Sequence, residues 1–100
     1  MSWVLRIEWH PAAVKEFARL DRAVQKRIRD LLTGDLHARL ETYRGELKGF
    51  VKLRVGDFRL ICRLRSDPET LTILLVGHRS NVYSARRKKA ARTRDRAQDD

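Results

Sequence analysis

The chain has a single cysteine, Cys62, among its 100 residues. One cysteine excludes an internal disulfide and suits a reducing compartment. No apolar run approaches the roughly 20 residues that a membrane-spanning helix needs, and the N-terminal residues lack the long apolar stretch of a secretory signal. These absences lead us to expect a cytoplasmic protein with no membrane association.

Residues that bind metals are also scarce. His10 and His37 have no partner at a spacing typical of a metal site. Cys62 falls on the apolar side of an alternating pattern, which is typical of a core residue. We therefore expect no metal and no cofactor.

Acidic residues are outnumbered, with 13 Asp and Glu against 23 Lys and Arg and a net charge of +10. Residues 84–100 hold seven basic and three acidic residues, so residues 1–83 keep sixteen basic and ten acidic ones. A polyanion, most commonly nucleic acid, is the expected partner; a high isoelectric point without such a partner is the alternative. We predict one folded domain over residues 1–83 and a basic tail over residues 84–100. The tail is partly helical or disordered, and either contacts RNA or is solvated.

The first half of the chain predicts one strand and two helices. A strand-like apolar run covers residues 2–9. Apolar residues at helical spacing predict helices over residues 11–19 and from Asp21 to Gly34. Residues 35–47 have weak periodicity, and we interpret them as a connecting segment whose apolar side chains anchor on the core.

The second half has the alternation typical of strands. Residues 49–55 and 58–65 alternate around Gly56-Asp57, a pair typical of a tight hairpin turn. Residues 71–76 are apolar nearly throughout, which predicts a third, central strand. The predicted fold class is α+β: an N-terminal strand, a helical hairpin, and a three-stranded antiparallel meander covered by the helices on one face.

The hairpin turn fixes which side chains share a face. If Gly56 and Asp57 form the loop, Arg54 lies opposite Arg59, and alternation places the apolar residues on the core face. The other face carries Phe50, Lys52, Arg54, Arg59, Ile61, Arg63 and Arg65. This face contains no acid within the hairpin, so opposed arginines repel unless salt screens them. A bound phosphate would offset the repulsion, and Phe50 offers a ring for base stacking.

Polar and aromatic residues follow the predicted third strand closely. His78, Arg79, Asn81 and Tyr83 lie within six positions. Antiparallel pairing predicts that this strand ends near the start of the second hairpin strand, away from the hairpin loop.

Three segments, taken in order, resemble toxins of the RelE/ParE superfamily, and the RelE branch in particular. The segments are residues 43–49, 52–60 and 76–83. The resemblance implies a microbial RNase-like fold and a toxin that enters the ribosomal A site. There it would cut mRNA by attack of a ribose 2′-hydroxyl on the adjacent phosphate. It also implies a cognate antitoxin that wraps the toxin in a hetero-oligomer and masks its site.

The working residues of the family are basic, with a terminal aromatic. Carried over residue by residue, the catalytic positions are Lys52, Arg59, Arg79 and Tyr83. The basic face and the residues after the last strand add an RNA-binding set of Arg54, Arg63, His78 and Phe50. Phe50 is a departure, because some RelE toxins have a further lysine at the matching position.

The proton carriers stay open between Lys52 and His78. Lysine acts as a base only in its neutral form, which neighbouring positive charges favour. Histidine titrates near neutrality and is the rival. Tyr83 either stacks on a base, holds the 2′-hydroxyl or anchors the core.

Other functions also stay open. They are a ParE-type inhibitor of DNA gyrase, an RNase that needs no ribosome, and an RNA-binding module without catalysis.

Overall fold

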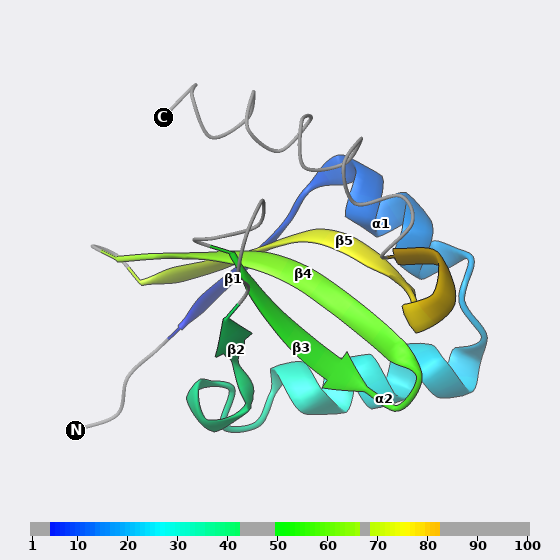
Figure 1. The fold of residues 1–100 in the computed structure, drawn as a ribbon, viewed down its shortest axis with the longest axis horizontal. Helices are drawn as coiled ribbons and strands as arrows, with labels where there is room; N and C mark the ends of the chain where they lie inside the picture. The colour runs from blue at the N-terminus through cyan, green and yellow to red at the C-terminus, as the bar shows by residue number, and fades with distance from the viewer. Residues whose placement is uncertain (1–4, 43–49, 67–68, 83–100) are drawn as a thin grey trace.

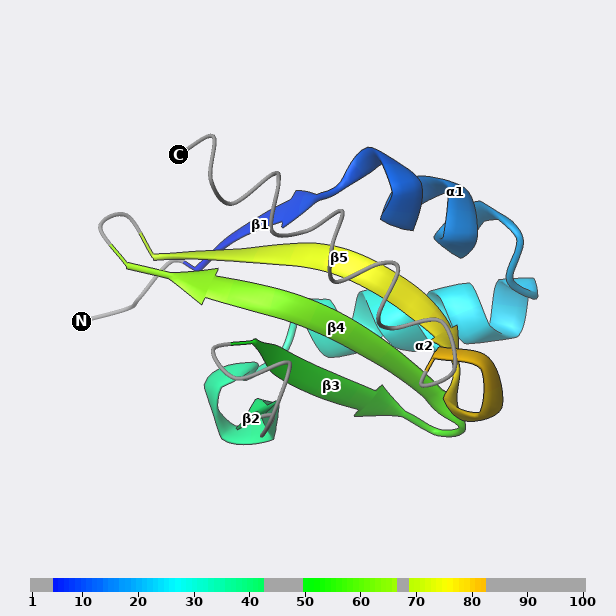
Figure 2. The ribbon, with the colours of Figure 1, turned by 45° about the horizontal axis from the view of Figure 1, so that its top comes forward.

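The computed structural model describes residues 5–42, 50–66 and 69–82. Its strands form one five-stranded sheet in the order β1-β5-β4-β3-β2, and both main helices lie on one face (Figures 1 and 2). The elements are β1 (Arg6–Trp9), α1 (Pro11–Ala18), α2 (Arg22–Leu32), the 3₁₀ helix η1 (His37–Arg39), β2 (Glu41–Thr42), β3 (Val51–Val55), β4 (Phe58–Arg65) and β5 (Thr70–His78). A helical turn over residues 79–82 follows β5. In the described part, no helix is long and apolar enough to cross a membrane. The α+β class is confirmed.

The two predicted helices are present, with ends within two residues of the predicted ones. The Nδ1 atom of His10 accepts the backbone N–H of Ala12 at 3.0 Å and caps α1, whose first residue is a proline. Asp21 occupies the N-cap of α2 but forms no side-chain capping bond. Ile28 of α2 is fully buried in the core cluster, so α2 is held by its apolar face.

The hairpin has the predicted register. Arg54 pairs with Arg59 and Val55 with Phe58 across β3 and β4. Gly56 has φ +59, a left-handed conformation that a tight turn requires and that glycine adopts without strain. The predicted core face is buried at its centre, where Leu53, Leu60 and Cys62 are fully inaccessible.

The N-terminal strand β1 joins the edge of the sheet, a pairing that the predicted three-stranded meander did not include. β1 pairs in parallel with β5, from Arg6 against Thr70 to Trp9 against Ile73. Beyond the end of β1, the carboxylate of Glu16 accepts the backbone N–H of Val76 at 3.0 Å. A side chain from α1 therefore satisfies a β5 donor that no strand covers.

The segment after α2 contains a second addition. Leu36 is buried and Leu40 packs on the core, as the sequence predicts. Tyr43 and Leu47 lie outside the described residues. β2 was not predicted; its two residues pair with β3, Glu41 opposite Lys52 and Thr42 opposite Val51.

Candidate RNA-binding and catalytic site

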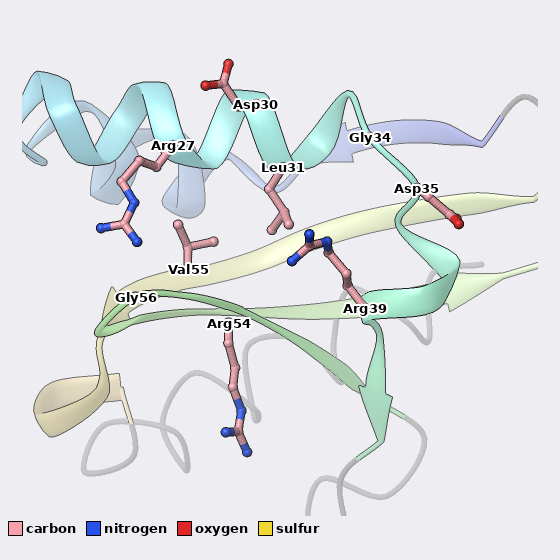
Figure 3. A pocket seen from close by; sticks show the side chains of 9 residues that line it. All are labelled: Arg27, Asp30, Leu31, Gly34, Asp35, Arg39, Arg54, Val55 and Gly56. Atoms are coloured by element: carbon pink, nitrogen blue, oxygen red, sulfur yellow. The ribbon is translucent and has the colours of Figure 1, made fainter.

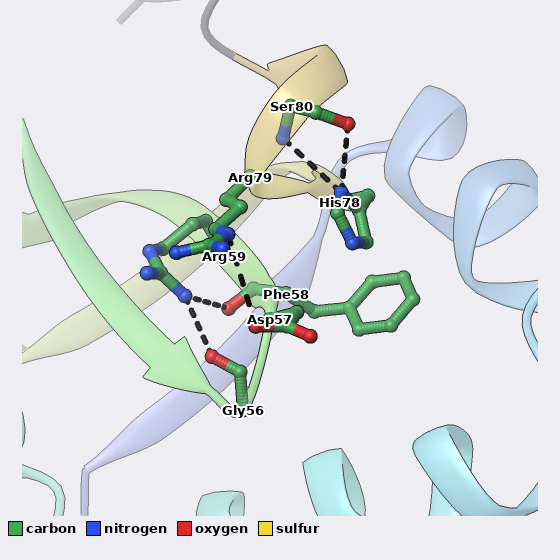
Figure 4. A network of polar contacts seen from close by, with 7 residues as sticks. All are labelled: Gly56, Asp57, Phe58, Arg59, His78, Arg79 and Ser80. Atoms are coloured by element: carbon green, nitrogen blue, oxygen red, sulfur yellow. Dashed lines mark hydrogen bonds and ion pairs between the residues drawn. The ribbon is translucent and has the colours of Figure 1, made fainter.

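The C-terminal end of β5 meets the β3–β4 turn (Figure 4). Arg59 pairs with Gly77 in the β4–β5 ladder, and the backbone N–H of Arg79 donates to the Asp57 carbonyl at 2.8 Å. The prediction that this end lies away from the hairpin loop is wrong, because β4 starts at the loop and its antiparallel partner must end there. We call the group Asp57, Arg59, His78 and Arg79 the hairpin corner.

The Arg59 guanidinium is held by the backbone of the turn. Its Nη1 atom donates to the carbonyl oxygens of Gly56 and Phe58, both at 2.9 Å. A guanidinium has five N–H donors in a planar fork. The Nε and Nη2 donors are not used in these two bonds, so they can bind phosphate oxygens from a fixed position.

Arg79 lies over the same turn and has an acidic neighbour. Its Nε atom is 3.8 Å from a carboxylate oxygen of Asp57, and both side chains are more than half exposed. Such a long, exposed ion pair contributes about 0–1 kcal/mol. A phosphate can therefore replace the Asp57 carboxylate at little cost.

His78 caps the helical turn that follows β5. Its Nδ1 atom accepts the backbone N–H of Ser80 at 3.2 Å and lies 2.8 Å from the Ser80 hydroxyl. Its ring also contacts Phe58 edge to face, with centroids 5.4 Å apart. Because a backbone N–H only donates, Nδ1 must be an acceptor, and the neutral ring carries its proton on Nε2. In this conformation neutral His78 offers a hydrogen-bond donor, not a base.

Lys52 and Arg54 follow one another on the outer face of β3. Arg54 lies opposite Arg59. Lys52 comes two residues before Arg54 on β3, and it is therefore diagonal to Arg59, a position that lies roughly 7–8 Å away in an antiparallel pair. The hairpin itself contributes no acid to this face, as predicted, but β2 adds one, because it places Glu41 opposite Lys52. The Glu41 carboxylate pairs with Nε of Arg54 at 3.1 Å.

The rest of the outer face is less polar than predicted. Ile61, Leu75 and Val82 are buried in a second small cluster, with Phe50 packed against it. Val82 lies over Gly77, where a Cβ atom would be 3.5 Å from that of Val82. The turn over residues 79–82 therefore folds back onto the outer face.

This cluster separates the remaining predicted residues from the hairpin corner. Phe50 takes part in apolar packing. Arg63 pairs with Thr72, four residues along β4 from Arg59, or about 13 Å at strand spacing. The structure thus gathers Lys52, Arg54, Arg59 and Arg79 at one end of the sheet. His78 lies at the same end but pairs with Phe58, so its ring projects from the face opposite to Arg59. Tyr83 lies outside the described residues.

Three polar groups of the site were missed from sequence: Glu41, Asp57 as an ion-pair partner, and Ser80. A two-residue strand has too little alternation to be recognised, so Glu41 gave no signal. Serine two residues after a histidine, at the end of a strand, is the pattern that indicates the His78 cap.

Neither an accessible thiol nor a metal centre competes with this arrangement among the described residues. Cys62 is fully buried, and burial raises the pKa of its thiol. No three His, Cys, Asp or Glu side chains of the described ranges form a group that could hold a metal ion.

Known proteins resemble this chain in sequence and in fold. Residues 7–83 match the family model of the ParE toxin of the parDE type II toxin–antitoxin system. No curated protein sequence matches the chain.

Several solved structures with a similar fold are toxins or toxin–antitoxin complexes. The RelBE2 toxin–antitoxin complex from Mycobacterium tuberculosis contains a chain that is 25% identical with a TM-score of 0.68, over 73% of this chain and 95% of that one. A YoeB/ParE toxin from Agrobacterium tumefaciens is 16% identical with a TM-score of 0.62, over 73% and 96%. The isolated RelE toxin of E. coli is 21% identical with a TM-score of 0.59, over 87% and 99%.

The family match extends over most of the chain, and the fold agrees with it. The RelE-like resemblance is confirmed at the level of the superfamily. The protein is therefore a toxin of the ParE family, within the RelE/ParE superfamily of type II toxin–antitoxin systems.

Proposed function

We propose that this toxin is an endoribonuclease that cleaves mRNA in the ribosomal A site and so inhibits translation. The observation that carries the proposal is the hairpin corner, where the β4–β5 register brings Arg59 and Arg79 to one end of the sheet. Lys52 and Arg54 extend the positive charge onto β3. Clustered guanidiniums suit the phosphorane that forms during RNA cleavage. A ribosomal target places the protein in the cytoplasm.

The reaction is an in-line transfer within the RNA. The 2′-hydroxyl oxygen bonds to the adjacent phosphorus as the bond to the 5′-oxygen breaks, which leaves a 2′,3′-cyclic phosphate. The 2′-hydroxyl proton passes to a base, and the departing 5′-oxygen takes up a proton from an acid. Arg59 and Arg79 stabilise the additional negative charge on the phosphorane.

We propose different roles for the two candidate proton carriers. Lys52 projects from the same face as Arg54 and Arg59, and we assign it the base role. Neutral His78 carries its proton on Nε2 and is the candidate donor to the leaving oxygen. Its ring lies beside Phe58, on the opposite face of the sheet from Arg59, so it can only act around the end of the sheet. Tyr83 follows Val82 directly in sequence, and the resemblance assigns it contact with the substrate.

The test is mRNA cleavage on programmed ribosomes, read by primer extension. The double variant Arg59→Ala/Arg79→Ala should cut on the order of 10²- to 10³-fold more slowly. The matched control, Arg22→Ala/Arg29→Ala, removes the same charge from exposed positions of α2 and should cut normally. Equal cleavage by both double variants would contradict the proposal.

Inhibition of DNA gyrase is the second candidate, and the match to the ParE family model favours it. Such a toxin acts by binding and does not need the hairpin corner. A gyrase supercoiling assay with the purified protein separates the two. Gyrase inhibition without cleaved mRNA would replace our proposal, and cleavage of free RNA would remove the ribosome from it.

We also propose an antitoxin partner. The similar chains from M. tuberculosis, Methanococcus jannaschii and Pyrococcus horikoshii are solved as toxin–antitoxin complexes. A net charge of +10 suits an acidic partner chain.

A further inference from the structure

A hollow of about 490 Å³ lies between α2 and the β3–β4 hairpin (Figure 3). Leu31 of α2 and Val55 of β3 supply its apolar surface, and three arginines line it: Arg27 of α2, Arg39 of η1 and Arg54 of β3. We call it the α2–hairpin groove. It differs from the hairpin corner, whose Arg59 and Arg79 do not line it.

Two arginines dominate the charge of this groove. Figure 3 shows Arg27 and Arg39 reaching into the space between α2 and the hairpin, whereas the carboxylates of Asp30 and Asp35 point away. Asp30 is paired with Lys26 at 2.9 Å. Among the described residues, no carboxylate is within ion-pair distance of Arg27 or Arg39.

The position of Arg27 is set by the hairpin turn. A Cβ atom built on Gly56 would lie 2.9 Å from Nη2 of Arg27, so the guanidinium rests against the turn backbone. The missing Cβ of Gly56 thus gives Arg27 its place at the groove.

We propose that the α2–hairpin groove binds an acidic peptide segment of a partner protein. Carboxylates of the segment bind Arg27 and Arg39, because the guanidinium fork matches carboxylate oxygens. An apolar side chain between them packs on Leu31 and Val55. The proposal names a surface for the antitoxin partner and rests on that part of the proposed function, independently of RNA cleavage.

The composition of the groove favours peptide over RNA. None of the described residues that line it is aromatic, so it offers no stacking surface for bases. Apolar contact beside paired guanidiniums fits alternating acidic and apolar side chains.

The test is fluorescence anisotropy with the full chain. The probe is a short fluorescein-labelled peptide of glutamate, aspartate and leucine, compared with its glutamine and asparagine analogue and with an RNA oligonucleotide of equal charge. Arg27→Ala/Arg39→Ala should weaken acidic-peptide binding by on the order of tenfold or more. The matched variant Arg22→Ala/Arg29→Ala should change it less than about twofold, because screened remote charges contribute little. Arg27→Lys/Arg39→Lys keeps the charge, and should bind weakly if the guanidinium fork matters.

Two results of the binding experiment would overturn the proposal. Equal losses in both alanine pairs would indicate attraction by net charge alone. A loss of RNA binding with unchanged peptide binding would make the groove a nucleic-acid surface. Thermal unfolding of each variant shows whether a loss of peptide binding comes from misfolding. If the alanine pair misfolds, peptide binding by Arg27→Lys/Arg39→Lys tests the proposal instead. Ribosomal cleavage by Arg27→Ala/Arg39→Ala should remain normal, so failure of this proposal is distinct from failure of the proposed nuclease.

Discussion

At the scale of single residues, His78 has a structural bond that constrains its chemistry. Its Nδ1 atom caps the turn over residues 79–82 through the Ser80 N–H. That turn carries Arg79 into the hairpin corner and Val82 onto the outer face. If His78→Ala lost activity, the loss could come either from the missing cap of the turn or from the missing proton donor, and this variant alone would not separate the two.

Two amide variants separate these roles of His78. The oxygen of Asn lies near the position of Nδ1 and keeps the cap, whereas Gln has no acceptor there. We expect His78→Gln to lower the free energy of unfolding by about 1 kcal/mol relative to His78→Asn, measured by urea denaturation. If His78 supplies a proton, both variants cut slowly; if it only caps, His78→Asn keeps wild-type cleavage. A more stable His78→Gln would contradict the cap.

Cys62 predicts a dependence of stability on alkaline pH. Burial raises the pKa of its thiol, so the unfolded chain loses this proton near pH 8.5 while the folded protein keeps it. The stabilising contribution is complete below the unfolded pKa and declines as pH rises above it, by up to about 1.4 kcal/mol per pH unit. Cys62→Val removes the effect.

Urea denaturation at several pH values checks the Cys62 prediction. The difference in unfolding free energy between wild type and Cys62→Val should stay constant up to about pH 8 and then move in favour of the variant. Lysine and tyrosine titrations cancel in this difference. A flat difference to about pH 10 would contradict a buried neutral thiol.

At the scale of elements, the β3–β4 turn connects the candidate catalytic site with the α2–hairpin groove. Gly56 has φ +59, and its missing Cβ leaves room for Arg27. We expect Gly56→Ala to lower the unfolding free energy by about 1–2 kcal/mol, since L-residues pay that much for the left-handed conformation. Chemical denaturation measures it.

Gly34 is the matched control for the turn. A Cβ there would meet the backbone carbonyl oxygens of Leu31 at 3.5 Å and Asp30 at 3.8 Å, both ordinary contacts. Gly34→Ala should be neutral or slightly stabilising, because it reduces the entropy of the unfolded chain. Equal destabilisation by both variants would indicate a general cost of losing glycine.

Elements with strong local patterns were predictable from sequence. The Gly56-Asp57 turn and the alternation on both sides determine the hairpin register, so Arg54 opposite Arg59 followed directly. The parallel β1–β5 pair and the two-residue β2 depend on contacts between distant segments, which leave no periodic signal. Ile61 appeared on the polar face; its burial depends on Leu75 opposite it and on the return of Val82 over Gly77, which the hairpin pattern does not contain.

The same limit applies to the site. The basic residues of the site could be identified from the sequence. Their acidic neighbours could not, because the pairing of distant strands brings them together. The acids Glu41 and Asp57 partner Arg54 and Arg79 because β2 and the hairpin turn bring them there. Charge repulsion at the site is therefore lower than the hairpin sequence alone predicts.

At the scale of the whole molecule, the two faces of the sheet differ in what covers them. The helices cover one face and enclose the main core (Figure 2). The other face combines a small apolar cluster with Arg54 and Arg59, whereas the His78 ring lies beside Phe58 on the helix-covered side. The proposed RNA binding by Arg59 and Arg79 can therefore be tested separately from attraction by the total charge of +10.

The salt dependence of RNA affinity measures this separation. Each phosphate contact on single-stranded RNA contributes about 0.7 to the slope of log affinity against log salt concentration. Arg59→Ala/Arg79→Ala should therefore reduce the slope by roughly 1.4 in anisotropy titrations. Arg22→Ala/Arg29→Ala, on the helix-covered side, should leave it unchanged. If both pairs reduce the slope equally, RNA is bound by diffuse charge, and the corner has no special share in it.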